Sequence, residues 1–452
     1  MHDAEFVARN LAAALLAGRW TKRALARRME SVLGRETRAD QKTVLFQLLA
    51  LAPQLYPPSP AWLVAFLLAA DRNVSSGDEP FDVDERPTRL LQVPEPCRLI
   101  LRPPLFAPAE RFRGLDIPKL PSPGDLARWL VIPVEHLDWF SDETRQHGRT
   151  DIPILQHYSY AFVPKSSGPP RLIEAPKPRL KSIQRGILHG ILDKVPAHAS
   201  AHGFVAGRSA LTAAQIHVGE DIVITIDLAD FFPSTPLRRV HALFRSLGFP
   251  WASARCLSGL CSTSTPRSVF FKVPAQKRHP LGVQRRYASP HLPQGAPTSP
   301  ALANLAAWRL DTRLAGLAKA YDARYTRYAD DLAFSGSERL ASRADSFLDV
   351  VETIIEDEGY TLNARKTRIM RRSARQRVTG LVVNNHLNVP RESYDALKAI
   401  LYNCARNGAE AENRSGDPDF RAHLDGRIGW VEQVNPQRGA KLRAMFRRVA
   451  WP

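Results

Sequence analysis

The sequence predicts an α+β protein with a mainly helical N-terminal extension, and three observations lead to that prediction. Apolar residues recur at helix spacing over residues 1–70, for example in Phe6–Leu16. From about residue 121 onward, short strand-like runs alternate with helical stretches. Two adjacent carboxylates, Asp330 and Asp331, stand at a tight turn between two of these runs. A turn of this kind between two strands indicates a metal-binding β-hairpin.

Length and charge narrow the class of protein. A chain of 452 residues has room for two or three domains, and we predict boundaries that give 1–120, 121–390 and 391–452. The net charge of +18 and the pI near 10.1 do not fit an ordinary metabolic enzyme and indicate a nucleic-acid partner. The alternative is a basic surface without a function.

Cysteine usage and hydropathy give a predicted location. The four cysteines are scattered, which is typical of a reducing cytoplasm rather than of a disulfide framework. The longest apolar run, Ala61–Ala70, is about half the roughly 20 residues that a membrane span needs. We therefore expect a cytoplasmic protein with no membrane partner.

The elements after residue 120 follow from local patterns. Ser122 is typical of a helix start before Leu126–Leu130. The polar, basic stretch Ser262–Pro290 is predicted to be a loop, either simply solvated or in contact with a nucleic-acid backbone. We expect strands at Tyr158–Val163, Arg171–Glu174 and Ile222–Asp227, and helices at Lys181–Lys194, Ala301–Asp311, Ala341–Glu358 and over most of residues 391–452.

Three carboxylates form the candidate catalytic centre. Asp227 ends the apolar run Ile222–Ile226, about a hundred residues before Asp330 and Asp331. Carboxylates at strand ends can hold two Mg²⁺ ions, or Mn²⁺ in their place, and two such ions clamp the attacking and leaving oxygens of a phosphoryl displacement. The backbone carbonyl of Leu228 is expected near the second ion. This is the chemistry of a nucleic-acid polymerase.

Two further features fit a nucleotide site beside the carboxylates. A ring at Phe232 could pack under the sugar of an incoming nucleotide and collide with a 2′-hydroxyl. Taken alone, Phe232 is better interpreted as a core residue, and the carboxylate hairpin reverses that preference. Gln294 and Gly295 lie in a turn before the expected helix Ala301–Asp311, where a flat group can approach the backbone closely. In isolation this stretch is an ordinary proline-rich loop.

Three cations are candidates for binding the triphosphate. Lys165 and Arg171 bracket a short hairpin and could reach the leaving pyrophosphate as it gains charge. The alternative for this pair is a solvated basic hairpin. Lys366 follows the helix after the carboxylates and could donate a proton to the pyrophosphate, although one lysine in a basic chain indicates little by itself.

The order of these stretches and their residues resemble the motifs of reverse transcriptases, and among them those of bacterial retrons. The resemblance begins near Pro121 with the strands around Lys165 and Arg171. The family's Asn-Ala-x-x-His element reads Ala213–His217 here, so His217 is kept and the Asn is not. The other matching stretches are His202–Phe204, Gly207–Ser209, Asp227–Phe232, Leu292–Pro300, Tyr328–Asp331, Asn363–Thr367 and Val378–Asn384.

The resemblance implies a right-hand polymerase fold, with fingers and palm over 121–390 and an RNA-binding thumb over 391–452. Retron enzymes copy part of a structured noncoding RNA into a short single-stranded DNA, beginning from a 2′-hydroxyl of a guanosine, so the product is branched. They act in anti-phage defence, usually with an effector protein. The implied partners are the cognate RNA, its DNA product and dNTPs, and the implied RNA contacts are Arg208, His217, Val378, Thr379 and Gly380.

Three alternatives stay open at this stage. A group II intron reverse transcriptase shares the Tyr-Ala-Asp-Asp hairpin but usually adds a maturase segment after the thumb, and only about 60 residues follow Arg391. A bacterial defence reverse transcriptase of another class is closer. A non-enzymatic RNA-binding protein on a polymerase fold is disfavoured by the intact Asp227, Asp330 and Asp331.

Overall fold

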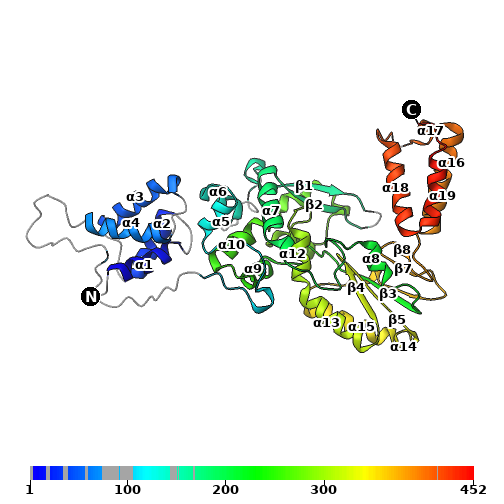
Figure 1. Cartoon of the computed structure of the whole chain (residues 1–452), viewed down its shortest axis with the longest axis horizontal. Helices are drawn as coiled ribbons and strands as arrows, with labels where there is room; N and C mark the ends of the chain where they lie inside the picture. Colours follow the sequence, from blue (N-terminus) through cyan, green and yellow to red (C-terminus); the bar gives the residue numbers. More distant parts are fainter. Residues whose placement is uncertain are drawn as a thin grey trace, which may run out of the picture. The chain divides into compact units, whose positions relative to one another are not determined.

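The computed structural model describes residues 4–16, 21–33, 39–55, 60–73, 91, 105–142, 150, 152–165, 168–414 and 416–451 (Figure 1). The chain forms two compact units. Unit 1 contains residues 1–196 and 232–306, and unit 2 contains residues 197–231 and 307–452. Most of the predicted linker Asp71–Thr88 lies outside the described residues. The predicted three-part division stays a prediction.

The N-terminal part of unit 1 is helical, as predicted. Its apolar stripes face one another because leucines recur every three or four residues, and Leu11, Leu15, Leu25, Leu45 and Leu63 are among the residues that form one buried core. The helices are α1 (Ala4–Leu16), α2 (Lys22–Leu33), α3 (Ala39–Leu55) and α4 (Pro60–Asn73).

The rest of unit 1 surrounds a β-hairpin. Strands β1 (Tyr158–Val163) and β2 (Arg171–Pro176) pair antiparallel with Tyr158 opposite Pro176. The expected helix start at Ser122 is confirmed, because its hydroxyl accepts a hydrogen bond from the backbone N–H of Asp125 in a capping box. The helices are α5 (Pro123–Trp129), α6 (Val134–Ser141), α7 (Pro178–Gly190), α9 (Leu237–Ser246), α10 (Trp251–Leu260), α11 (Leu281–Ala288) and α12 (Ser299–Ala306).

The loop predicted over Ser262–Pro290 is wrong. This stretch contains the 3₁₀ turns Arg267–Lys272 and Ala275–Lys277 followed by α11. Phe270 and Tyr287 are buried in a small core with Leu172 of β2. The prediction rested on the basic residues of this stretch and therefore missed the apolar residues that are buried between them.

Unit 2 is built on a four-stranded antiparallel sheet in the order β4-β5-β3-β6. Strand β3 is central because Ile222, Val223, Ile224 and Ile226 are fully or almost fully buried, which suits a strand covered on both faces. Helix α13 packs on β4 and on α15 (Figure 1). The strands are β3 (Ile222–Asp227), β4 (Arg324–Tyr328), β5 (Asp331–Gly336) and β6 (Arg368–Arg371), and the helices are α8 (Ala210–Gln215), α13 (Trp308–Ala320), α14 (Glu338–Ala341) and α15 (Ala344–Asp357).

The C-terminal part of unit 2 is helical, as predicted. A two-stranded ribbon, β7 (Arg377–Val378) and β8 (Leu381–Val382), leads into α16 (Arg391–Asn407), α17 (Ala409–Glu412), α18 (Phe420–Val434) and α19 (Pro436–Phe446). These helices share a buried core that includes Leu401, Leu424 and Leu442. In the part of the chain that the structure describes, no helix combines the length and apolar character needed to cross a membrane.

Candidate active site

Two of the three candidate carboxylates, Asp227 and Asp331, lie on adjacent strands of unit 2, and Asp330 lies in the turn between β4 and β5. Asp227 at the end of β3 stands directly opposite Asp331 at the start of β5 in the antiparallel register. The backbone N–H of Leu228 donates to the carbonyl of Asp330 at 2.9 Å, which ties the end of β3 to the hairpin turn. Pairing of strands 100 residues apart in the sequence therefore brings together the residues that the sequence singled out.

Each carboxylate makes ionisation of its neighbours less favourable, because like charges repel. Burial, followed by the charges of Asp330 and Asp227, raises the pKa of Asp331 to about 6. The Lys366 ammonium lies 2.7 Å from a carboxylate oxygen of Asp227, and this hydrogen bond raises the pKa of Lys366. The Asn363 amide donates to the other oxygen at 3.0 Å. A cluster of this kind favours the arrival of cations.

The donor chemistry of this cluster suits a hard divalent cation, because Mg²⁺ prefers carboxylate and carbonyl oxygens. Within the described ranges, no three His, Cys, Asp or Glu side chains are already arranged to hold one ion. The two carboxylate oxygens of Asp227 accept hydrogen bonds from Lys366 and Asn363. A metal at Asp227 would replace the Lys366 contact.

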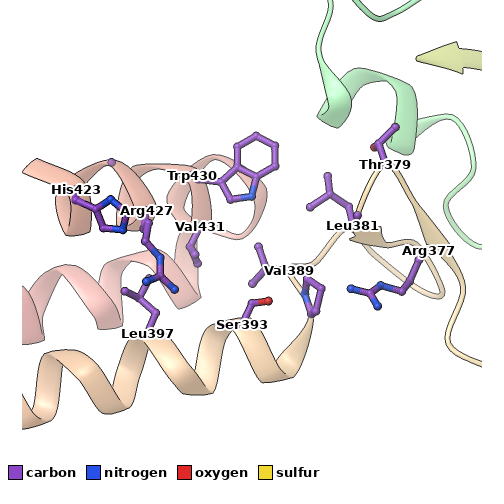
Figure 2. A pocket seen from close by; sticks show the side chains of 13 residues that line it. Arg377, Thr379, Leu381, Val389, Ser393, Leu397, His423, Arg427, Trp430 and Val431 are labelled. Carbon is purple, nitrogen blue, oxygen red and sulfur yellow. The ribbon is translucent and has the colours of Figure 1, made fainter. Parts of the chain in front are cut away.

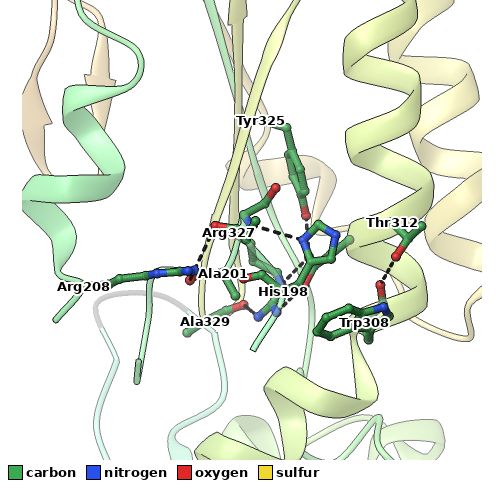
Figure 3. Close-up of polar contacts among 11 residues, drawn as sticks. His198, Ala201, Arg208, Trp308, Thr312, Tyr325, Arg327 and Ala329 are labelled. Atoms are coloured by element: carbon green, nitrogen blue, oxygen red, sulfur yellow. Dashed lines mark hydrogen bonds and ion pairs between the residues drawn. The ribbon is translucent and has the colours of Figure 1, made fainter. Parts of the chain in front are cut away.

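A buried ion pair between Arg327 and Asp311 lies next to the candidate hairpin turn, and Figure 3 shows Arg327 beside Ala329. Arg327 of β4 and Asp311 of α13 are both fully buried and form two hydrogen bonds of 2.8 and 2.7 Å. The remaining guanidinium nitrogen donates to the carbonyl of Ala329 at 3.1 Å. Ala329 has a φ of 56°, a left-handed conformation that costs energy for a residue with a side chain. Arg327 thereby fixes the residue that precedes Asp330.

The His202–Phe204 stretch also shapes the turn. The His202 N–H donates to the carbonyl of Arg327 at 2.7 Å, which places Gly203 against the hairpin. A Cβ on Gly203 would come within 2.6 Å of the Ala329 backbone nitrogen. Only glycine fits at this distance, so the stretch has a structural role in positioning the turn.

Four predicted nucleotide contacts, Lys165, Arg171, Gln294 and Gly295, belong to unit 1. Lys165 and Arg171 are exposed at the two ends of the β1–β2 connection, and Gln294 is half-buried. Gly295 has a φ of 137°, and a Cβ there would lie 3.0 Å from the carbonyl oxygen of Glu174, which explains why glycine occupies this turn. Phe232, the fifth, is half-buried in unit 1, and its contact with a nucleotide sugar stays a prediction.

Glu174 of β2 holds the Gln294–Gly295 turn, and the sequence reading missed it. Its backbone N–H donates to the carbonyl of Gln294 at 2.8 Å, and its carboxylate accepts from the Gln294 N–H at 3.2 Å. The same carboxylate is fully buried, accepts from the Thr265 hydroxyl and lies 3.1 Å from His291. Glu174 raises the pKa of His291, although burial of the imidazole opposes that effect. A lone acidic residue between the apolar Leu172, Ile173 and Ala175 was the available signal.

We expect Glu174→Gln to raise the KM for dNTP about tenfold, because losing roughly 1.4 kcal/mol of hydrogen bonding at this pivot loosens the turn. Steady-state single-nucleotide extension measures KM and kcat separately. Glu110→Gln, at an exposed glutamate of the same unit, is the matched control. A drop in melting temperature with an unchanged KM would show that Glu174 serves only the fold.

The predicted RNA contact of His217 is wrong. The imidazole is fully buried, its two nitrogens are 2.7 Å from the hydroxyls of Ser335 and Thr326, and burial lowers its pKa to about 3. His217 therefore joins α8 to the sheet as a neutral side chain. The side chain of Val378 is also buried, so a direct RNA contact of that side chain is wrong for the same reason.

The other three predicted RNA contacts, Arg208, Thr379 and Gly380, are at least partly exposed to solvent and stay predictions. Arg208 is half-buried, and one of its guanidinium nitrogens donates to the carbonyls of His198, Ala199 and Ala201. Thr379 and Gly380 form a turn with φ values of 48° and 83°. The Thr379 hydroxyl donates to the Ala210 carbonyl at 2.9 Å, which fixes this turn on the start of α8.

Comparison with known proteins gives consistent matches. A family described as "Reverse transcriptase (RNA-dependent DNA polymerase)" matches residues 163–385. The chain is similar to the retron Mx65 reverse transcriptase of Myxococcus xanthus, with 42% identity over 64% of this chain and 64% of that protein. It is 37% identical to the retron Mx162 reverse transcriptase of the same organism over 75% of this chain and 69% of that protein. The retron Ec86 reverse transcriptase of Escherichia coli is 31% identical over 70% and 88%.

A solved structure of a foamy viral protease-reverse transcriptase with double-stranded DNA aligns loosely with this chain. The TM-score is 0.32 and the identity is 14%, over 66% of this chain and 44% of that one. A likeness this distant supports no conclusion about the site.

Proposed function

The chain belongs to the bacterial retron reverse transcriptases, and we propose that it copies part of a cognate structured noncoding RNA into a short, branched single-stranded DNA. The family is one of RNA-directed DNA polymerases, which use divalent metal ions and have nucleic-acid partners. The single observation that carries the proposal is the cluster of Asp227, Asp330 and Asp331 on paired strands and the adjoining turn.

Different residues of the chain would bind the metal ions and donate the proton. Asp227, Asp330, Asp331 and the Leu228 carbonyl would hold two Mg²⁺ ions. When bound, these ions stabilise the charge on the attacking and leaving oxygens. Lys366, which pairs with Asp227 in this structure, would be the residue that donates a proton to the leaving pyrophosphate.

The remaining candidate residues would bind and orient the substrates. Lys165 and Arg171 contact the triphosphate of the incoming dNTP, and the Gln294–Gly295 turn contacts its base or the template. In the proposed retron role, synthesis starts from a guanosine 2′-hydroxyl of the cognate RNA in the cytoplasm, and the product serves anti-phage defence together with an effector protein.

Primer extension tests the polymerase activity, and a second reaction tests the branch. We expect the purified chain to extend a DNA primer on an RNA template with dNTPs and Mg²⁺, and a chelator to stop the reaction. When the cognate noncoding RNA is supplied, the DNA product should remain joined to RNA and be released by a 2′,5′-debranching enzyme. Primer extension without a branched product would retain the polymerase and reject the retron role.

The sugar preference should depend on Phe232. We expect Phe232→Val to raise the use of ribonucleotides relative to deoxynucleotides roughly tenfold, because the smaller side chain leaves room for a 2′-hydroxyl. Single-nucleotide extension with each sugar gives the ratio. Phe271→Val, at an exposed phenylalanine, is the control. An unchanged ratio in an active Phe232→Val enzyme would assign Phe232 to the core.

A further inference from the structure

A cavity of 630 Å³ opens between the β7–β8 turn, the start of α16 and one face of α18 in unit 2 (Figure 2). Its size falls in the range of about 300–1,000 Å³ that is typical of sites for small organic groups. Leu381, Val389 and Leu397 supply apolar walls, and Trp430, Arg377 and Arg427 stand around them. No aspartate or glutamate is among the described residues that line it.

Trp430, Arg377 and Arg427 at this cavity form no ring stacking and no salt bridge with other described residues. Trp430 is 38% exposed, a large fraction for a tryptophan, and stacks on no other ring in the described part of the chain. Arg377 and Arg427 make no salt bridge among the described residues, whereas nearby Arg375 and Arg443 are paired with Glu392 and Glu432. The pKa of Glu392 is lowered first by hydrogen bonds from a backbone N–H and from Arg375, and the charge of Arg377 adds only a smaller effect.

We propose that this cavity binds one unstacked nucleobase of single-stranded RNA, with the base on the Trp430 indole and the flanking phosphates on Arg377 and Arg427. Single-stranded RNA is recognised by bases that leave the stack and lie on aromatic rings. One planar guanidinium group can donate two parallel hydrogen bonds to two oxygens of the same phosphate. Figure 2 shows the two arginines on different sides of the cavity, so the chain on either side of the base can reach a cation.

A hydrogen bond holds one wall of the cavity in place without a ligand. The Thr379–Gly380 turn lines the cavity and is anchored by the Thr379 hydroxyl on the Ala210 carbonyl. A preformed wall reduces the entropy lost on binding. The inference rests on the proposed function only in taking RNA, the template of the family, as the polymer that enters.

The test uses fluorescence anisotropy of the full chain with a labelled oligoadenylate. We expect Trp430→Ala to weaken binding about tenfold, which corresponds to the loss of one stacked base, while Trp430→Phe retains most of the affinity. Arg377→Gln and Arg427→Gln should each lower the slope of log K against log salt by about 0.7. Tyr402→Ala, at an exposed aromatic residue on α16 that does not line the cavity, should bind as the parent does.

Matched probes separate the possible outcomes. An oligoadenylate without its bases should bind the parent and Trp430→Ala equally, because no base remains to stack. Equal losses in Trp430→Ala and Tyr402→Ala, or a loss confined to oligodeoxyadenylate, would overturn the proposal. Primer extension is measured in parallel, so an inactive parent chain would reject the proposed function while the binding comparison still decides about the cavity.

Discussion

Asp330→Asn and Asp227→Asn are each expected to abolish Mg²⁺-dependent DNA synthesis while RNA binding stays largely intact. Each substitution removes a charged oxygen ligand from the centre, and several kcal/mol of transition-state stabilisation are lost with it. The expected fall in the rate of primer extension is on the order of a thousandfold or more. Single-turnover extension on a primed RNA template measures it, and anisotropy with the same template measures binding.

The control for these variants is Asp322→Asn. Asp322 is exposed at the turn before β4 and has a φ of 55°, a conformation that asparagine also adopts readily. It should leave the rate and the binding of Mn²⁺ unchanged, whereas Asp330→Asn should weaken Mn²⁺ binding measured by paramagnetic relaxation of water. Full activity of both Asp330→Asn and Asp227→Asn would reject the catalytic assignment.

The strands that carry the candidate carboxylates could be predicted because their signals are local. The buried run Ile222–Ile226 ends at Asp227, and β3 ends at that residue. The adjacent Asp330 and Asp331 mark a turn between two apolar-rich runs, and the structure has β4 and β5 on either side of it. Strand β1 likewise has the expected bounds. Patterning of apolar residues and turn chemistry act over a few residues, so they can be read without knowledge of the fold.

The supporting contacts could not be predicted because they join distant segments. Glu174 and His291 meet across 117 positions, and His217 meets Ser335 across 118. A polar residue with such a partner cannot be distinguished by sequence from one that faces a ligand. The RNA contact of His217 was implied by the family's Asn-Ala-x-x-His element, and that element does not reveal that the imidazole is buried against the sheet. Arg327 was overlooked for a related reason. Its guanidinium resembles the many surface arginines of a basic chain until Asp311 is placed beside it.

Arg327→Met is expected to destabilise the protein by about 3–5 kcal/mol, because it leaves the buried Asp311 carboxylate without its partner. Denaturant unfolding of the full chain, followed by circular dichroism, measures the change. Arg324→Met is the matched control, since Arg324 lies on the same strand, is exposed and pairs with the half-buried Glu220. Loss of a pair whose cation faces solvent costs about 1 kcal/mol or less.

The double variant Arg327→Met/Asp311→Leu separates stability from catalysis. Replacing both charges with apolar groups removes the unpaired carboxylate, so part of the stability should return, while the buried Tyr325 hydroxyl loses its acceptor on Asp311. The hydrogen bond from Arg327 to the Ala329 carbonyl is still missing, so the turn that carries Asp330 stays loose and kcat should remain low. Recovery of kcat together with stability would mean that the pair serves the fold alone and that the catalytic turn keeps its geometry without Arg327.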